Sequence, residues 1–165
     1  MANSSAALLR QEQTRDLDRF RVARRGNAGA HAYVLLLGLE TFDLRKLLQT
    51  IENGLPFRCY ERLSRNTGIP TDRLLELVDI PRRTLLRRKH EGRFSPNESD
   101  RLLRAARLFG KALDLFEGDR QAVLDWLSTR QTAIGGAVPL DLARSETGAR
   151  EVEAVLGRLE HGVFS

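Results

Sequence analysis

The segment Ser95-Pro96-Asn97-Glu98 constrains the fold more than any other part of this sequence, because it is a complete signal for the start of a helix. Ser95 suits the N-cap, Pro96 suits the first helical position, and Glu98 can reach back to the backbone of the cap. The helix that this signal opens is predicted to run from about 96 to 116. Apolar residues occupy most of its circumference, so we expect it to be buried on several sides and to form the central rod of the fold.

The rest of the chain also favours helices joined by short turns. Apolar residues recur at helical spacing, and glycine or proline marks most of the predicted ends. The predicted helices lie within residues 42–56, 57–69, 71–78, 81–91 and 120–129, and a last helix, capped by Thr147, precedes the C-terminus. Periodicity does not decide between strand and helix for the apolar segment 31–41. Helix after helix in this order predicts an all-α fold.

The composition is that of a globular protein. Of the 165 residues, 41% are hydrophobic and 30% are charged. No apolar run is long enough for a transmembrane helix, and the first residues do not resemble a secretory signal. Cys59 is the only cysteine, which excludes an internal disulfide and fits a reducing compartment. We therefore expect a cytoplasmic protein in which Cys59 is a small core residue.

Charge is distributed unevenly along the chain. The net charge is +4 in residues 1–69, +4 in residues 70–110 and −3 in residues 111–165. A basic front and an acidic back suggest two surfaces with two kinds of partner. We therefore divide the chain into an N-terminal arm (1–30), a central domain (31–110), whose predicted role in DNA binding and dimerisation is argued from the helices below, and a C-terminal domain (111–165).

The N-terminal arm is predicted to be flexible. Residues 1–30 are rich in arginine and uncharged polar residues, and they end in a Gly-Asn-Ala-Gly break at 26–29. Two interpretations stay open, a solvated tail and a basic arm that contacts phosphates.

The stretch 79–93 carries six cationic side chains and only two acids, and the cations lie on either side of Leu85 and Leu86. The predicted helices 71–78 and 81–91 are joined by about two residues, which is the arrangement of a helix-turn-helix. The apolar residues that would form the interface between the two helices are Leu74, Leu75, Val78, Ile80 and Leu85. Asp79 departs from the glycine that is frequent in such turns, but an aspartate can adopt the left-handed conformation with some strain.

The remaining face of the second helix supplies the candidate DNA-binding residues. They are Arg82, Arg83, Thr84, Arg87, Arg88, Lys89 and Arg93. Arginines near the N-terminus of such a helix can pair with guanine, and those further along can hold phosphate. The alternative is that this charge forms a solvated face or pairs with acids inside the fold.

No pattern in the sequence indicates catalysis. His31, His90 and His161 are scattered without the spacing of a metal site. Neither a glycine-rich phosphate loop nor a Gly-x-Ser-x-Gly elbow is present. The acids Glu151 and Glu153 are interpreted as the exposed side of an amphipathic helix. The sequence therefore predicts a protein that is not an enzyme, with no cofactor and no metal.

Six motifs in order resemble the Xre/MbcA/ParS antitoxin family, whose members are encoded beside RES-domain toxins. The motifs are GLPF (54–57), RTLLRR (83–88), SPNESDRLLRAARLF (95–109), WL (126–127), GG..P (135–139) and LGRLEHGVF (156–164). The resemblance implies an Xre/Cro-like helix-turn-helix bundle followed by a small helical toxin-binding domain. It also implies a type II antitoxin that binds operator DNA and represses its own operon, as a homodimer or in a larger complex with the toxin.

The same resemblance implies how the toxin is blocked. The C-terminal segment of the family obstructs the active site of a toxin that consumes NAD or transfers ADP-ribose from it, so NAD would be the toxin's substrate. By position this role falls to Arg158, Glu160, His161, Gly162, Val163, Phe164 and Ser165. Two alternatives stay open: Phe164 can fold back onto its own core, and the chain can be a stand-alone repressor with a C-terminal dimerisation or ligand-sensing domain.

Overall fold

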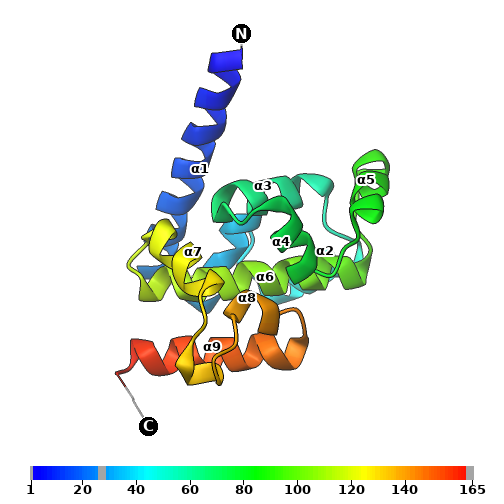
Figure 1. The fold of residues 1–165 in the computed structure, drawn as a ribbon. Coiled ribbons are helices and arrows are strands. Elements are labelled where there is room, and N and C mark those ends of the chain that lie inside the picture. The colour runs from blue at the N-terminus through cyan, green and yellow to red at the C-terminus, as the bar shows by residue number, and fades with distance from the viewer. Residues whose placement is uncertain (1, 26–28, 163–165) are drawn as a thin grey trace.

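The computed structural model describes residues 2–25 and 29–162, and every regular element in these ranges is a helix (Figure 1). In chain order the elements are α1 (Ala2–Arg25), η1 (Gly29–Leu37), α2 (Leu44–Glu52), α3 (Phe57–Thr67), α4 (Thr71–Leu77), α5 (Arg82–Glu91), α6 (Pro96–Leu115), α7 (Arg120–Ser128), η2 (Thr132–Ile134), α8 (Pro139–Leu142) and α9 (Glu146–Glu160). The predicted all-α fold is confirmed. The undecided segment 31–41 lies mostly in the 3₁₀ helix η1.

Helix α6 is the central rod, as the sequence predicts. It runs through the middle of the molecule in Figure 1, with other helices on both sides. The capping box is complete, because the Ser95 side chain accepts from the Glu98 N–H and the Glu98 side chain accepts from the Ser95 N–H. Apolar side chains are buried around most of the helix, namely Leu102, Leu103, Ala105, Ala106, Leu108, Phe109, Ala112 and Leu113.

Two groups of helices pack on this rod. On one side lie η1, α3 and part of α1, and the side chains of residues 34–37 in η1 are all buried. On another side α9 runs alongside α6 (Figure 1). One cluster of buried residues extends from Leu63 and Leu74 to Leu140 and Val152. Because α6 continues through residue 110, the boundary proposed between the two domains falls inside a helix, and the division stays a prediction.

The N-terminal arm, which the sequence predicts to be flexible, is a helix over residues 2–25. These residues form α1, whose C-terminal half is docked on the body while its N-terminal half projects (Figure 1). The Asp16 carboxylate is buried and accepts hydrogen bonds from Arg62 (2.9 Å) and Asn66 (3.0 Å). Phe20, one helical turn later, is also buried. An ion pair also joins Arg24 to Asp114. The sequence did not indicate this docking, because the partners of these side chains lie far away in the chain.

Three predicted helix starts shift by one or two residues. Pro81 is the N-cap of α5 and not its first residue, and Thr71 is the first residue of α4 and not its cap. In α9 the cap is Ser145 and not Thr147, because the Ser145 hydroxyl accepts the Gly148 N–H at 3.0 Å. Helix existence was therefore predicted better than helix boundaries.

Candidate functional site

Helices α4 and α5 form the predicted helix-turn-helix. The five apolar residues assigned to their interface are all buried: Leu74, Leu75, Val78, Ile80 and Leu85. Asp79 in the turn has a φ of +49°, in the left-handed region, and its carboxylate accepts from Arg101 at 3.3 Å. The turn therefore uses the strained aspartate that the sequence indicated.

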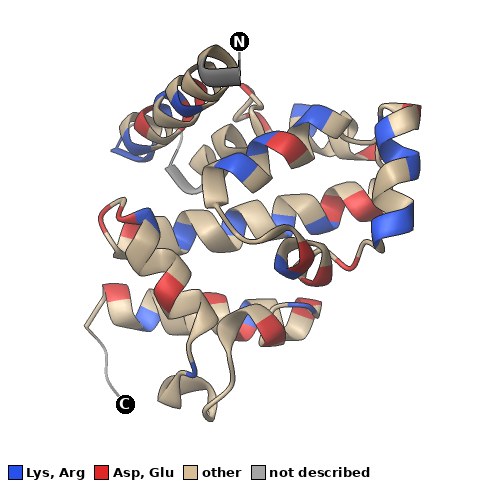
Figure 2. Ribbon diagram, turned by 45° about the horizontal axis from the view of Figure 1, so that its top comes forward, with Lys and Arg blue, Asp and Glu red and all other residues tan. Residues whose placement is uncertain are grey.

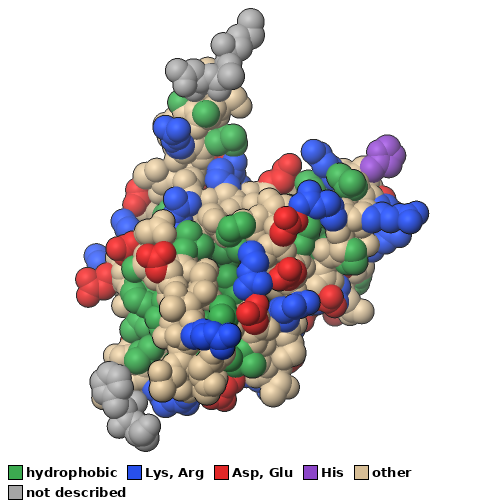
Figure 3. Space-filling model, viewed as in Figure 1, with side chains coloured by type: hydrophobic (Ala, Val, Ile, Leu, Met, Phe, Trp, Pro, Cys, Tyr) green, Lys and Arg blue, Asp and Glu red, His purple; other side chains and the backbone are tan. Residues whose placement is uncertain are grey.

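Helix α5 stands at one end of α6 and carries a cluster of cationic positions (Figure 2). The side chains of Arg82, Arg83, Arg87 and Lys89 are exposed, and Thr84 is half-buried. Arg82 pairs with the exposed Asp72, and Arg87 lies 3.7 Å from Glu91. Arg83 and Lys89 make no ion pair in the part of the chain that the structure describes. A space-filling view shows cations gathered over α5 at the edge of the molecule (Figure 3).

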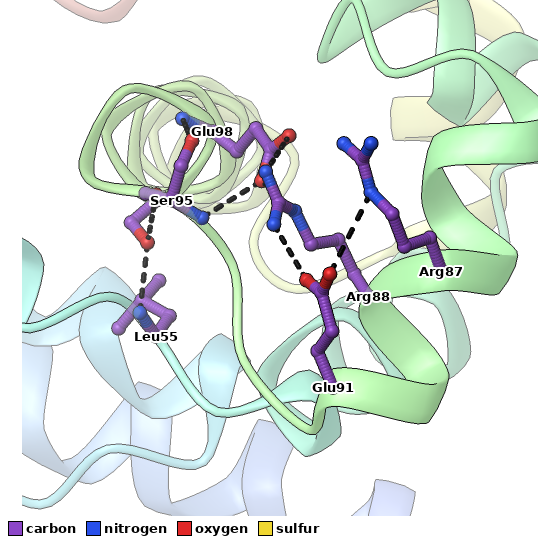
Figure 4. A network of polar contacts seen from close by, with 7 residues as sticks. Leu55, Arg87, Arg88, Glu91, Ser95 and Glu98 are labelled. Atoms are coloured by element: carbon purple, nitrogen blue, oxygen red, sulfur yellow. Dashed lines mark hydrogen bonds and ion pairs between the residues drawn. The ribbon is translucent and has the colours of Figure 1, made fainter.

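Two of the predicted DNA-binding residues make contacts with the fold itself, and one of them, Arg88, turns away from this surface. The side chain of Arg88 is 19% exposed and turns inward, where it pairs with Glu98 and Glu91 (Figure 4). Arg93 donates to the backbone carbonyl of Gly54 at 2.8 Å. The prediction that Arg88 faces outward is therefore wrong, whereas Arg93 is exposed despite its hydrogen bond to Gly54, and its contact with DNA stays a prediction. Sequence spacing did not show this, since the acceptors come from other elements.

Glu98 is the acid that holds Arg88. Its side chain is 8% exposed and accepts two hydrogen bonds from Arg88, at 2.7 and 3.1 Å. It also accepts the Ser95 backbone N–H at 2.8 Å. Burial alone would raise the pKa of Glu98, but the hydrogen bonds from Arg88 and Ser95 outweigh burial and lower it. Glu98 is therefore a carboxylate at neutral pH and balances the charge of Arg88.

A groove of about 790 Å³ lies between α1, α3 and α5. Phe57 and Leu86 are among its apolar lining residues, and Arg58 and Lys89 are among its cations. The groove exists because α1 is docked on α3, so the sequence, which suggested a flexible arm, gave no signal of it. Its cations extend the basic surface beside α5.

The C-terminal candidates lie at the end of α9. Arg158, Glu160, His161 and Gly162 are exposed, and Arg158 lies 3.6 Å from Glu151. The other candidates, Val163, Phe164 and Ser165, lie outside the described residues, so the choice between a free Phe164 and one folded back stays open.

Helix α9 is anchored to α6 by apolar and ionic contacts. Ala149, Val152, Val155 and Leu156 are buried. Glu153, which the sequence placed on an exposed face, is only 10% exposed, because it pairs with Arg107 (2.8 Å) and Lys111 (2.9 Å) of α6.

A further ion pair strengthens this contact at the start of α9. Glu146 accepts hydrogen bonds from Arg104 and Arg150, each at 2.9 Å. These bonds lower the pKa of Glu146, so it is ionised at neutral pH.

The described residues offer no arrangement typical of a metal or redox site. Among them, no group of three histidine, cysteine or acidic residues could hold a metal ion. Cys59 is a buried core residue, as predicted. Burial raises the pKa of its thiol to about 11, which makes it a poor nucleophile. No helix in the described ranges is long and apolar enough to cross a membrane.

Comparisons with known proteins agree with this geometry. Residues 46–107, which include α4 and α5, match the family model of the antitoxin Xre-like helix-turn-helix domain. Residues 111–162 match the antitoxin Xre/MbcA/ParS C-terminal toxin-binding domain. An antitoxin Xre of Yersinia enterocolitica is 41% identical over 130 residues, covering 78% of this chain and 88% of that protein. An antitoxin Xre of Photorhabdus laumondii is 29% identical over 116 residues, covering 70% and 78%. With both domains matched and most of a relative covered, this chain belongs to the Xre family of antitoxins.

Proposed function

We propose that this antitoxin represses its own operon by placing α5 in the major groove of operator DNA. The observation that carries the proposal is the row of exposed cations on α5, the second helix of the helix-turn-helix. Among them, Arg83 and Lys89 make no ion pair in the described part of the chain. Arg83 and Arg87 are four residues apart and therefore share a face of α5. Such arginines can contact base edges and phosphates together.

We also propose that the C-terminal segment blocks the active site of a RES-domain toxin that consumes NAD or transfers ADP-ribose from it. Support comes from the match of residues 111–162 to a toxin-binding domain and from the exposed end of α9. The sequence continues past α9 into the apolar pair Val163-Phe164. An apolar pair close to the acidic Glu160 suits a cleft built for an anionic dinucleotide, because the acid can meet the cations of such a cleft.

A homodimer would match the two-fold symmetry of an operator. We expect such a dimer to form through the long helix α6 and its neighbours. The apolar side chains of α6 are buried inside its own chain, so α6 could contribute only its exposed polar face and the neighbouring helices would supply the apolar contacts.

One experiment with two arms tests both proposals on the full-length protein. Arg83→Ala with Arg87→Ala should weaken binding to the promoter DNA of its operon by at least about tenfold and reduce the slope of log K against log salt by about two. The matched control is Arg144→Ala with Arg150→Ala, which removes the same charge from exposed positions of the C-terminal part. If the double variant and its control bind alike, α5 is not the DNA-reading helix.

The other arm removes the residues after Leu159. This truncation should relieve inhibition of the toxin from the adjacent gene, measured as growth arrest on co-expression, and should leave DNA binding unchanged. Phe164→Ala is the finer variant, and Phe42→Ala, at an exposed phenylalanine of the N-terminal part, is its control. A truncated protein that still neutralises the toxin would refute blocking by the C-terminal segment.

A further inference from the structure

Helix α5 has little apolar contact with the rest of the fold. Leu85 is its only buried residue, and its neighbour Leu86 is 63% exposed. One buried leucine fixes where a helix sits but does little to fix its rotation about its own axis. The direction in which Arg83 and Arg87 point therefore depends on polar contacts.

The polar contact of α5 that has the strongest geometry is made by Arg88. Its Nε and Nη2 donate to the two oxygens of Glu98, at 2.7 and 3.1 Å, and its Nη1 donates to Glu91 at 2.6 Å. A planar guanidinium in a two-bond contact with a carboxylate is held in both position and orientation. Arg88 follows Arg87 directly, so the rotation that turns Arg88 inward turns the face of Arg83 and Arg87 outward.

The acceptor of this contact is itself fixed to the central rod. Glu98 is the third residue of α6 and closes the capping box through the Ser95 N–H. The next residue, Ser99, donates to the Ser95 carbonyl and accepts the Leu55 N–H, both at 2.7 Å. The Glu98 carboxylate also lies at the positive end of the α6 dipole, which favours its ionised form. It is therefore a rigid support for Arg88.

We propose that Arg88 and Glu98 are positioning residues for the DNA-reading helix: the pair sets the rotation of α5 and contacts no DNA itself. This inference rests on the proposed binding of operator DNA by α5. It assigns a role in DNA affinity to an acid, Glu98, whose charge by itself opposes DNA binding. It also changes the role of Arg88 from a phosphate contact to an internal support.

The direction in which Glu98→Gln changes the affinity for DNA separates positioning from simple electrostatics. Glu98→Gln removes a negative charge near α5, so a purely electrostatic effect would tighten DNA binding. Positioning predicts the opposite, because the glutamine cannot form the charged two-bond contact with Arg88. We expect at least about tenfold weaker operator binding at a fixed salt concentration. Asp72→Asn is the control, since it removes an exposed acid that pairs with Arg82, and it should leave binding unchanged or tighter.

Arg88→Lys separates positioning from a direct phosphate contact. Lysine keeps the charge that a phosphate needs but cannot make the planar two-bond contact, so we expect it to lose most of the affinity that Glu98→Gln loses. Thermal unfolding of each full-length variant, followed by circular dichroism, identifies loss of affinity that comes from unfolding. If Glu98→Gln is unfolded at the assay temperature, Arg88→Lys decides.

The two proposals fail in different ways. Binding as tight as wild type in either folded variant would overturn the positioning role and leave DNA binding by α5 intact. A wild-type protein that does not distinguish operator from unrelated DNA, alone or with its toxin, would overturn both.

Discussion

At its N-terminal end, α6 holds α5 mainly through the ion pair between Arg88 and Glu98, whereas further along it holds α9 through a row of buried apolar side chains. Ion pairs are present at both contacts, but at α9 they border an apolar core that already fixes the helix. At α5 there is one buried leucine, and the ion pair has to supply the orientation.

The difference follows from what each helix has to leave free. A helix that enters a DNA groove needs most of its circumference exposed, so it cannot bury an apolar stripe on several sides. A helix that supports a binding segment beyond its end can bury a full face and expose its last turn. In α9 the charges Glu146 and Glu153 are neutralised by arginine and lysine of α6, whereas on α5 Arg83 and Lys89 have no ion-pair partner among the described residues.

The largest expected effect tests the apolar side of this comparison. Leu156 is 2% exposed in the contact of α9, so Leu156→Ala should lower the free energy of unfolding by about 3 kcal/mol through lost burial and a cavity. Leu86→Ala on α5, at a leucine that is 63% exposed, should change it by less than about 0.5 kcal/mol. Urea unfolding measures both. An equal loss in the free energy of unfolding for the two variants would show that Leu86 makes stabilising apolar contacts despite its exposure.

A second effect tests how tightly the first turn of α9 packs against the end of α8. A Cβ atom at Gly148 would lie 1.8 Å from the carbonyl oxygen of Leu142, so Gly148→Ala forces the backbone to move. We expect a loss of about 2 kcal/mol in the free energy of unfolding. The matched control is Gly157→Ala in the same helix, where a Cβ meets nothing within 4 Å and should stabilise the protein by up to about 1 kcal/mol. A tolerated alanine at 148 would mean that the start of α9 is loosely packed.

Local patterns in the sequence were enough to predict the rod and the helix-turn-helix. The capping box at Ser95 and Glu98 needs residues only three apart, and the interface of Leu74, Ile80 and Leu85 needs only helical spacing and a short turn. Burial followed these patterns closely. Such features are encoded within about ten residues and survive without knowledge of the tertiary fold.

Features that depend on distant partners were not predictable in the same way. Helix α1 docks on the body because Asp16 accepts hydrogen bonds from Arg62 and Asn66, which lie 46 and 50 residues away. Arg88 belonged to a basic cluster by spacing, but its orientation depends on Glu98 in the next helix. The sequence therefore identified the basic surface but did not show which of its arginines support it and which face the solvent.

The smallest expected effect compares the acids at the two contacts of α6 as the pH falls. The pKa of Glu98 and that of Glu146 both lie below their ordinary value of 4.5 in the folded protein. A lowered folded pKa contributes stability that is complete above the unfolded value and is lost as the pH falls through the folded value. Wild-type stability should therefore decrease below about pH 4.5.

Glu98→Gln should flatten this decrease more than Glu146→Gln, because the side chain of Glu98 is 8% exposed and that of Glu146 is 47% exposed and better screened. Urea unfolding between pH 7 and pH 3 measures the two slopes, and a larger flattening for Glu146→Gln would show that the contact at α9, and not that at α5, depends more on its ion pair.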